Sequence, residues 1–334
     1  MIELLLVTII LNFLFFFYLK KIENFVNIYD LPDNRLKKHK SKVPLLGGII
    51  IMINLCVLVL LTYFFDYQFL DNKLSLRSCF ATFFFLFSFF ILGAIDDKYK
   101  LKPEKKFFLS ILFSIFFLSL SDDFLVSNIR LSFYDQLIFL NDFSFFFTIF
   151  CIIILINSLN FYDGINGQSI IFFIIIFGYL SYSSPLSFFY LFIIFVLLFI
   201  LILNLQNKLF MGDSGIYALG SVLIMSLIYE YNILKTFEYV DEIFFLLILP
   251  GYDLLRLSIT RIFNGKNAFY GDRNHIQHLL IKRFSLTQTN ICLILLTLLP
   301  IFLFSFLDLS FFIVITLFTC VYIYLIFKFS KYGY

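Results

Sequence analysis

Tryptophan is absent from this 334-residue sequence, and charged residues are scarce. Only 14% of the chain is charged while 61% is hydrophobic, which excludes an ordinary soluble globular protein and is typical of a membrane protein with several spans. Without tryptophan, any aromatic belt at the membrane interfaces must come from the 20 tyrosines. The five cysteines are dispersed without a close pair, so neither a disulfide framework nor a cysteine-based metal site is expected.

Long apolar runs fill most of the chain and predict a fold class: an all-α polytopic membrane protein with about eleven transmembrane helices. The first run is followed by Lys20-Lys21 and has neither a basic leader nor a small-residue cleavage site, so we interpret it as an uncleaved span. We expect one transmembrane domain over residues 1–334. The predicted spans are residues 2–19, 45–65, 78–95, 107–121, 143–160, 168–183, 187–205, 215–230, 242–260, 289–306 and 310–327.

The distribution of basic residues predicts the orientation of these spans. With the N-terminus outside and the C-terminus cytoplasmic, 21 of the 25 Lys and Arg residues fall on the cytoplasmic side, in agreement with the positive-inside rule. The longest outer segment, residues 121–142, is expected to hold either a short strand pair or a re-entrant piece. No internal repeat is recognisable in the motifs, which disfavours a transporter.

The first inner loop combines basic residues with features that a lipid-binding patch does not need. It runs from Asp30 through Asp33-Asn-Arg35 and His39 to Pro44 and Gly47-Gly48. One interpretation is a juxtamembrane loop that binds anionic headgroups. The acidic and amide residues and the closing glycines favour a site instead.

A pair of adjacent carboxylates, Asp96-Asp97, ends the third predicted span and is followed by Lys98, Lys100 and Lys102. A solvated helix end is the simpler interpretation, because carboxylates are costly inside a bilayer. Acids beside bases also suit Mg²⁺ and phosphate chemistry, where a cation bridges carboxylate and phosphoryl oxygens.

Two further polar segments interrupt the apolar runs. The asparagine loop, Asn157-Ser-Leu-Asn-Phe-Tyr-Asp-Gly-Ile-Asn-Gly-Gln168, spaces Asn157, Asn160 and Asp163 so that they share one helix face. The segment Phe210-Met-Gly-Asp-Ser-Gly215 sets Asp213 between glycines at a helix start. Backbone N–H groups there favour an anion and Asp213 would hold a metal, although an ordinary N-cap explains the residues about equally well.

The last polar segment, residues 261–278, contains Asp272-Arg273 and two of the three histidines of the chain, His275 and His278. A lone histidine is usually structural, but two histidines beside an acid and an arginine favour a site. All these segments fall on the predicted cytoplasmic face, which fits a phosphate-handling enzyme. A channel would carry polar residues inside its spans, and the predicted spans are nearly pure apolar.

Together, five motifs in order resemble the polyprenyl-phosphate N-acetylhexosamine-1-phosphate transferases (glycosyltransferase family 4). They are the first inner loop, Asp96-Asp97, Asn157 to Gly164, Phe210 to Gly215, and Asp272 to His278, so the motif-bearing core covers about residues 28–283. The first loop resembles the branch that uses nucleotide-activated N-acetylhexosamines more than the muramoyl-pentapeptide branch. Asn166 and Gln277 depart from the family pattern, where an acid and a histidine are usual.

The resemblance implies an Mg²⁺-dependent enzyme (with Mn²⁺ as a substitute) in the bacterial inner membrane, with its active site on the cytoplasmic face. It would transfer N-acetylhexosamine-1-phosphate from a UDP-sugar to undecaprenyl phosphate, release UMP and start synthesis of a cell-envelope polysaccharide. Membrane lipid surrounds such a protein, a homodimer would be in keeping with the family, and no nucleic-acid partner is expected. The resemblance does not specify which N-acetylated sugar is transferred. It also leaves open whether the acceptor attacks the donor directly or a phospho-enzyme forms first.

The residues carried over by the resemblance fall into three groups. The implied catalytic residues are Asp96, Asp97, Asp163 and His275, and Asp213 is the implied metal ligand. The implied substrate-binding residues are Asp30, Asn34, Arg35, His39, Asn157, Asn160, Asn166, Arg273 and His278. The alternatives are a phospho-muramoyl-pentapeptide transferase and a non-enzymatic transporter of lipid-linked sugars.

Overall fold

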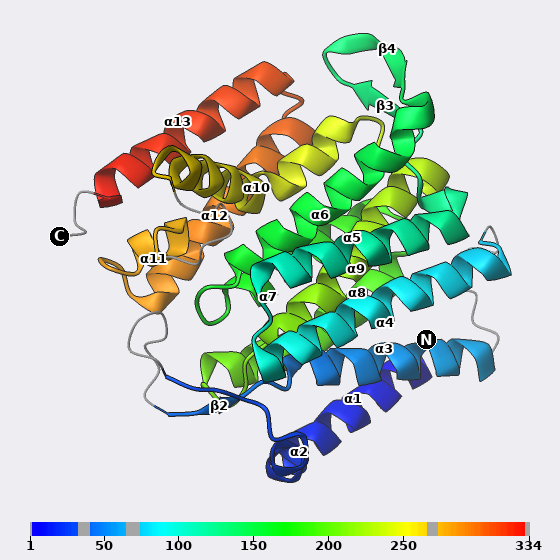
Figure 1. The fold of residues 1–334 in the computed structure, drawn as a ribbon, viewed down its shortest axis with the longest axis vertical. Helices are drawn as coiled ribbons and strands as arrows, with labels where there is room; N and C mark the ends of the chain where they lie inside the picture. The colour runs from blue at the N-terminus through cyan, green and yellow to red at the C-terminus, as the bar shows by residue number, and fades with distance from the viewer. Residues whose placement is uncertain (1, 33–40, 65–73, 266–272, 331–334) are drawn as a thin grey trace. The chain divides into compact units, whose positions relative to one another are not determined.

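Helices form wherever the sequence is apolar over a long run. The computed structural model describes residues 2–32, 41–64, 74–265 and 273–330, and each of the eleven predicted spans coincides with a helix there (Figure 1). Among the described residues, seven helices are long and apolar enough to cross a membrane. An eighth is added if the pair α1 (Ile2–Phe17) and α2 (Leu19–Val26), bent by 71°, forms one span.

The helical polytopic fold class is therefore confirmed, whereas eleven crossings and the orientation of the termini stay predictions. Two predicted spans correspond to the shorter apolar helices α3 (Gly47–Phe64) and α7 (Gln168–Ser183). A third corresponds to α5 (Pro103–Leu120), whose first turns carry Glu104, Lys105 and Lys106.

The chain divides into two compact units. Unit 1 comprises Met1–Asp123 and Phe173–Met225, and unit 2 comprises Phe124–Phe172 and Ser226–Tyr334. Helices α7 and α9 (Gly212–Tyr229) contribute residues to both. The expectation of a single transmembrane domain over residues 1–334 stays a prediction.

Unit 1 is organised around the pair α4 (Leu76–Tyr99) and α5, which lie side by side, with α3 against α4 (Figure 1). Phenylalanines fill the contact: the rings of Phe85 and Phe117 stack with centroids 4.2 Å apart, and both are fully buried. Besides these helices and α1 and α2, the unit contains strands β1 (Tyr29–Asp30) and β2 (Val43–Pro44), which pair antiparallel, and helix α8 (Ser187–Leu205). The short helix η1 (Asp122–Phe124) contributes residues to both units.

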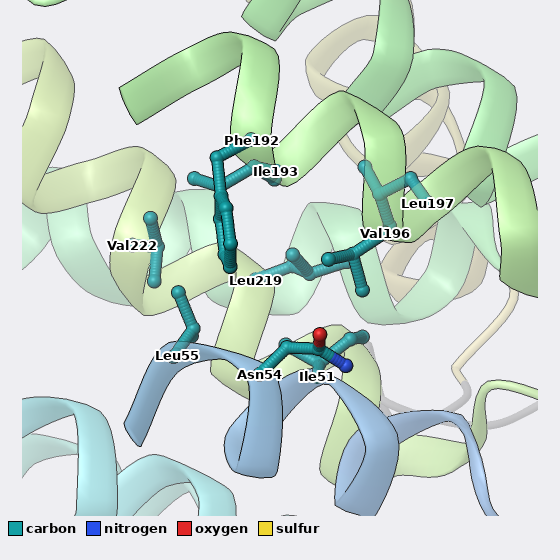
Figure 2. A pocket seen from close by; sticks show the side chains of 9 residues that line it. All are labelled: Ile51, Asn54, Leu55, Phe192, Ile193, Val196, Leu197, Leu219 and Val222. Carbon is teal, nitrogen blue, oxygen red and sulfur yellow. The ribbon is translucent and has the colours of Figure 1, made fainter. Parts of the chain in front are cut away.

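A small apolar pocket lies in unit 1 between α3, α8 and α9, and Asn54 is the polar side chain on its wall (Figure 2). Asn54 and Asn12 of α1 are both buried, and each amide donates to the other at 3.1 and 3.3 Å. Each also donates to the carbonyl four residues earlier in its own helix. This pocket shares no lining residue with the polar motifs.

Unit 2 is organised around α10 (Val240–Phe263), which packs against α6 (Ser144–Tyr162) and α12 (Leu286–Ser305). Within residues 121–142, for which a strand pair was one of two predicted alternatives, β3 (Asn128–Leu131) and β4 (Tyr134–Phe139) make an antiparallel hairpin (Figure 1). The remaining elements are η2 (Asn141–Phe143), the π-helix η3 (Glu230–Leu234), α11 (Ile276–Leu280) and α13 (Phe311–Ser330).

Candidate functional site

The backbone of unit 1 joins the first inner loop to the Phe210–Gly215 motif. The Phe210 N–H donates to the Pro44 carbonyl at 2.9 Å, and Gly47 and Gly48 donate back to the carbonyls of Phe210 and Met211 at 3.1 and 3.2 Å. Backbone hydrogen bonds therefore join two motifs that are more than 160 residues apart in the sequence.

Glycines allow α3 and α4 to approach the start of α9 closely. A Cβ at Gly48 would lie 2.4 Å from Ser214 Oγ, and one at Gly93 would lie 2.5 Å from the Asp213 carbonyl oxygen. Gly212 adopts φ +71°, a left-handed conformation that glycine tolerates best, and a Cβ there would lie 2.6 Å from Asp97 Oδ2. Side chains at these positions would push apart the elements that carry Asp97 and Asp213.

Asp97 caps the first turn of α9 from a different helix. Its Oδ1 accepts a hydrogen bond from the Asp213 N–H at 2.8 Å, and its Oδ2 accepts from the Ser214 N–H at 3.0 Å and the Ser214 hydroxyl at 2.7 Å. The carboxylate thus satisfies N–H groups that a helix start leaves without intrahelical partners. Asp97 is 5% exposed, so its contacts indicate that it holds Asp213 in place.

Lys106 joins the other two carboxylates. Its Nζ lies 3.0 Å from Asp96 Oδ2 and 3.3 Å from Asp213 Oδ2. The turn between α4 and α5 brings Lys106 to Asp96. Helix α4 ends where Lys100 adopts a left-handed φ of 52°, and α5, which begins at Pro103, runs back beside α4. Asp96 Oδ1 also accepts from the Leu101 N–H at 2.7 Å. Asp96, Asp97, Asp213 and Lys106 are called the aspartate cluster below.

In unit 2, the asparagine loop adjoins α11. A Cβ at Gly164 would lie 2.7 Å from Gln277 Nε2 and 3.2 Å from His278 Nε2, so glycine is needed for this approach. Gln277 is fully buried and donates to the Phe161 carbonyl at 3.3 Å. The amide at 277, one of the two departures from the family pattern, therefore joins the two motifs.

Individual side chains of the asparagine loop differ in exposure. Asp163 is exposed and accepts from the Ser169 hydroxyl, whereas Asn157 and Asn160 are half-buried in the last turns of α6. Asn157 donates to the carbonyl of Ile153 at 2.7 Å. At Asn166, the other departure, the backbone carbonyl accepts from Asn290 at 3.0 Å.

His275 is surrounded by residues that sequence reasoning missed. Its Nδ1 lies 2.7 Å from Asp253 Oδ2, and its Nε2 lies 3.4 Å from Arg261 Nη2. Arg256 and Tyr322 hold the other oxygen of Asp253. Asp253, Arg256, Arg261, His275 and Tyr322 are called the histidine cluster below.

The expectation of nearly pure apolar spans is wrong for α10, because Asp253 and Arg256 lie within the predicted span 242–260. Ionisable residues within a span are rare enough that they point to function, and this signal was available in the sequence. Lys106 offered a weaker signal, since it was one of several lysines after Asp96-Asp97.

The described site residues fall into two groups by unit: Asp96, Asp97 and Asp213 meet in unit 1, and unit 2 contains Asn157, Asn160, Asp163, Asn166, Arg273, His275 and His278. Asp30 is half-buried in β1, where it pairs with Val43 of β2, and Arg273 is half-buried two residues before His275. The predictions for Asn34, Arg35 and His39 lie outside the described residues, as does Asp272. No group of three or more His, Cys, Asp or Glu side chains forms a metal cage within the described ranges.

The fold and these two groups define a class: a helical membrane protein that holds ionisable side chains among apolar helices. Comparison with known proteins makes the class specific. Residues 79–230 match the family model described as glycosyl transferase family 4, a stretch that contains Asp96-Asp97, the asparagine loop and Asp213. The resemblance drawn from the motifs is therefore confirmed.

Several named proteins are similar to most of the chain. The undecaprenyl-phosphate alpha-N-acetylglucosaminyl 1-phosphate transferase of Escherichia coli K12 is 27% identical over 281 residues, which cover 80% of this chain and 73% of the relative. Its namesake in Yersinia pestis is 25% identical over the same coverage. A probable undecaprenyl-phosphate N-acetylglucosaminyl 1-phosphate transferase of Bacillus subtilis is 28% identical, covering 78% of this chain and 72% of the relative.

Proposed function

We propose that the protein transfers an N-acetylhexosamine-1-phosphate from a UDP-sugar to undecaprenyl phosphate and releases UMP. The observation that carries the proposal is the aspartate cluster, in which two motifs of the resembled family, Asp96-Asp97 and Phe210 to Gly215, meet beside one lysine. The names of the similar proteins, which specify undecaprenyl phosphate and N-acetylglucosaminyl 1-phosphate, support the acceptor and the donor class.

The aspartate cluster fits Mg²⁺ that is held partly by the substrate. Oxygen atoms of Asp96 and Asp213 converge on one ammonium group, and Mg²⁺ in phosphoryl-transfer sites is commonly held by one or two carboxylates together with substrate phosphates. When bound, the ion neutralises charge on the diphosphate and on the departing UMP. Asp213 is the proposed metal ligand, with Asp96 as the second carboxylate.

In this reaction, the residues of unit 1 have different roles. Asp96 orients the acceptor phosphate or takes its proton, so that an acceptor oxygen attacks the β-phosphorus of the UDP-sugar. Asp97 holds the start of α9 and thereby the Asp213 side chain. Asp30 of the first inner loop, together with Asn34, Arg35 and His39, binds substrate.

The motifs of unit 2 supply donors for the nucleotide, sugar and phosphate groups. Asn157, Asn160, Asp163 and Asn166 bind the metal–diphosphate assembly or the nucleotide. Arg273, His275 and His278 bind phosphate or the sugar, and a planar guanidinium is well suited to phosphate oxygens. The active site faces the cytoplasm of the bacterial inner membrane, an orientation supported by the bias of lysine and arginine.

The test is turnover by the purified protein in nanodiscs containing undecaprenyl phosphate. UDP-N-acetylglucosamine, other UDP-N-acetylhexosamines and UDP-muramoyl-pentapeptide are supplied in parallel, with and without Mg²⁺, and UMP release is measured. We expect Mg²⁺-dependent release with one UDP-N-acetylhexosamine. Turnover of the muramoyl-pentapeptide donor alone would move the protein to that branch, and no turnover with any donor would favour a transporter or scaffold.

A further inference from the structure

His275 sits in a rigid, buried position that fixes its ring. Its side chain is almost wholly buried, with the residue 4% exposed, and it stacks against Phe161 with ring centroids 5.6 Å apart and planes inclined by 25°. The residue is the N-cap of α11, and its carbonyl accepts hydrogen bonds from the N–H groups of His278 and Leu279. The imidazole therefore meets two fixed neighbours, one at each nitrogen.

Those neighbours have opposite hydrogen-bonding chemistry. Asp253 Oδ2, 2.7 Å from Nδ1, belongs to a carboxylate, which when ionised only accepts. Arg261 Nη2, 3.4 Å from Nε2, belongs to a guanidinium, which only donates. Both contacts are satisfied together only when the hydrogen of His275 is on Nδ1 and the lone pair is on Nε2.

Asp253 is itself fixed by donors from three helices. Its Oδ1 accepts from Arg256 of α10 at 2.8 Å, from the Tyr322 hydroxyl of α13 at 2.8 Å, and from the Ile276 N–H of α11 at 3.2 Å. Arg256 also donates to the Tyr322 oxygen at 2.9 Å. Since three donors occupy Oδ1, Oδ2 is left facing His275 and accepts from its ring.

From this geometry we infer that Asp253 is a positioning residue that holds His275 as the Nδ1–H tautomer, so that Nε2 serves as a hydrogen-bond acceptor. The inference rests on the proposed function and changes one of its assignments. A His275 ring in this state accepts from a donor such as Arg261 and does not act as a cationic phosphate ligand. Arg273 and His278 then supply the donors to phosphate.

The substitution Asp253→Asn tests the inference with almost no change in shape. The three donors at Oδ1 require the amide oxygen there, which turns the amide NH₂ toward His275 Nδ1. His275 must then place its hydrogen on Nε2, against the N–H of Arg261. We expect kcat for UMP release to fall about 100-fold or more, as it does when a catalytic histidine is held in the wrong tautomer, with a smaller change in KM.

The decisive readout is independent of activity. The chain has three histidines, so ¹⁵N-histidine labelling in nanodiscs gives few signals, and the His275→Gln variant identifies those of His275. We expect a protonated Nδ1 and an unprotonated Nε2 in the unsubstituted protein, exchanged in Asp253→Asn. Tyr322→Phe, which keeps the carboxylate, should keep the original tautomer.

Three outcomes would overturn the inference: a hydrogen on Nε2 in the unsubstituted protein, an unchanged tautomer in folded Asp253→Asn, or kcat within about threefold of the original. The first measurement needs no variant at position 253, so it decides the question even if Asp253→Asn does not fold. Failure of the proposed function has a different signature, because the unsubstituted protein would then turn over no donor while the tautomer result stands.

Discussion

The aspartate cluster and the histidine cluster each contain an aspartate whose oxygens are all engaged, but with different donors. Asp97 accepts mainly from backbone N–H groups at the start of α9, whereas Asp253 accepts from an arginine, a tyrosine and a histidine. The aspartate cluster contains three carboxylates and one lysine, which contacts two of them, so it has an excess of negative charge. In the histidine cluster, two arginines accompany one carboxylate.

This difference in charge predicts different partners for the two clusters. An excess of carboxylate suits a cation and, through it, a diphosphate. A cluster rich in arginine and histidine suits phosphate or sugar oxygens directly. The same residue type, aspartate, thus has a role that is set by its neighbours, which substitutions in the two clusters can test.

The largest effect is expected for Asp213→Asn. The substitution keeps the shape but removes the most exposed carboxylate of the aspartate cluster, which is the proposed metal ligand. UMP release should fall at least about 100-fold, because the charge of the leaving group loses its stabilisation. The rate with saturating UDP-sugar and Mg²⁺ in nanodiscs measures the effect.

Asp135→Asn is the matched control for this substitution. Asp135 is exposed in strand β4 of the hairpin, so its loss should leave the rate within about twofold and the unfolding temperature unchanged. Retained activity in Asp213→Asn would contradict the proposal that Asp213 binds the metal ion.

The second prediction compares Lys106→Gln with Arg256→Gln. Each leaves buried carboxylate without a charged partner, which costs about 3 kcal/mol of stability and lowers the unfolding temperature. Millimolar Mg²⁺ should restore much of the loss in Lys106→Gln, since Asp96 and Asp213 then offer their oxygens to the ion. Mg²⁺ should not restore the unfolding temperature of Arg256→Gln, because Asp253 is 2% exposed and its oxygens accept from other donors.

Thermal unfolding of the two variants with Mg²⁺, with Ca²⁺ and with chelator makes this comparison. Equal rescue of both variants would show a general effect of divalent ions on the membrane protein. No rescue of Lys106→Gln would contradict a cation site between Asp96 and Asp213.

Much of the fold could be predicted from the sequence, because hydrophobic runs of membrane length leave little choice but helix. The strand pair in residues 121–142, the predicted outer segment, was one of two alternatives, and the hairpin of β3 and β4 decides between them. The bend of 71° between α1 and α2 was not predicted, since an apolar run continues through Phe17 and Tyr18 without proline or glycine.

The candidate site was predicted in part. Asp96, Asp97 and Asp213 stand out because polar residues interrupt apolar runs, and the structure brings them together. Their separate roles were beyond the sequence, since the capping of α9 by Asp97 joins residues more than 110 apart. Asp253 could have been singled out as an ionisable residue inside a predicted span, but its contact with Tyr322 depends on how α10 and α13 pack.

The third prediction concerns the close approach of α4 to α9. In Gly93→Ala the added methyl would lie 2.5 Å from atoms of Asp213 and Ser214, so the helices must separate. We expect a loss of about 1–3 kcal/mol in stability and a clear loss of activity, because Asp97 then caps α9 less well. Gly178→Ala is the control, since nothing lies within 4 Å of the added methyl there. Comparing the unfolding temperatures of the two variants shows whether the stability loss comes from the contact with α9 or from the replacement of a glycine as such.

The smallest effect is expected at the edge of the histidine cluster. Tyr322→Phe removes the hydroxyl that donates to Asp253 at 2.8 Å, while Arg256, Ile276 and His275 still hold the carboxylate. Stability should fall by about 1 kcal/mol, with a rate within about threefold of the original. Tyr324→Phe on the same helix is exposed and serves as control, with no measurable change expected. A rate loss in Tyr322→Phe as large as that of Asp253→Asn would mean that the hydroxyl, and not the carboxylate, controls His275.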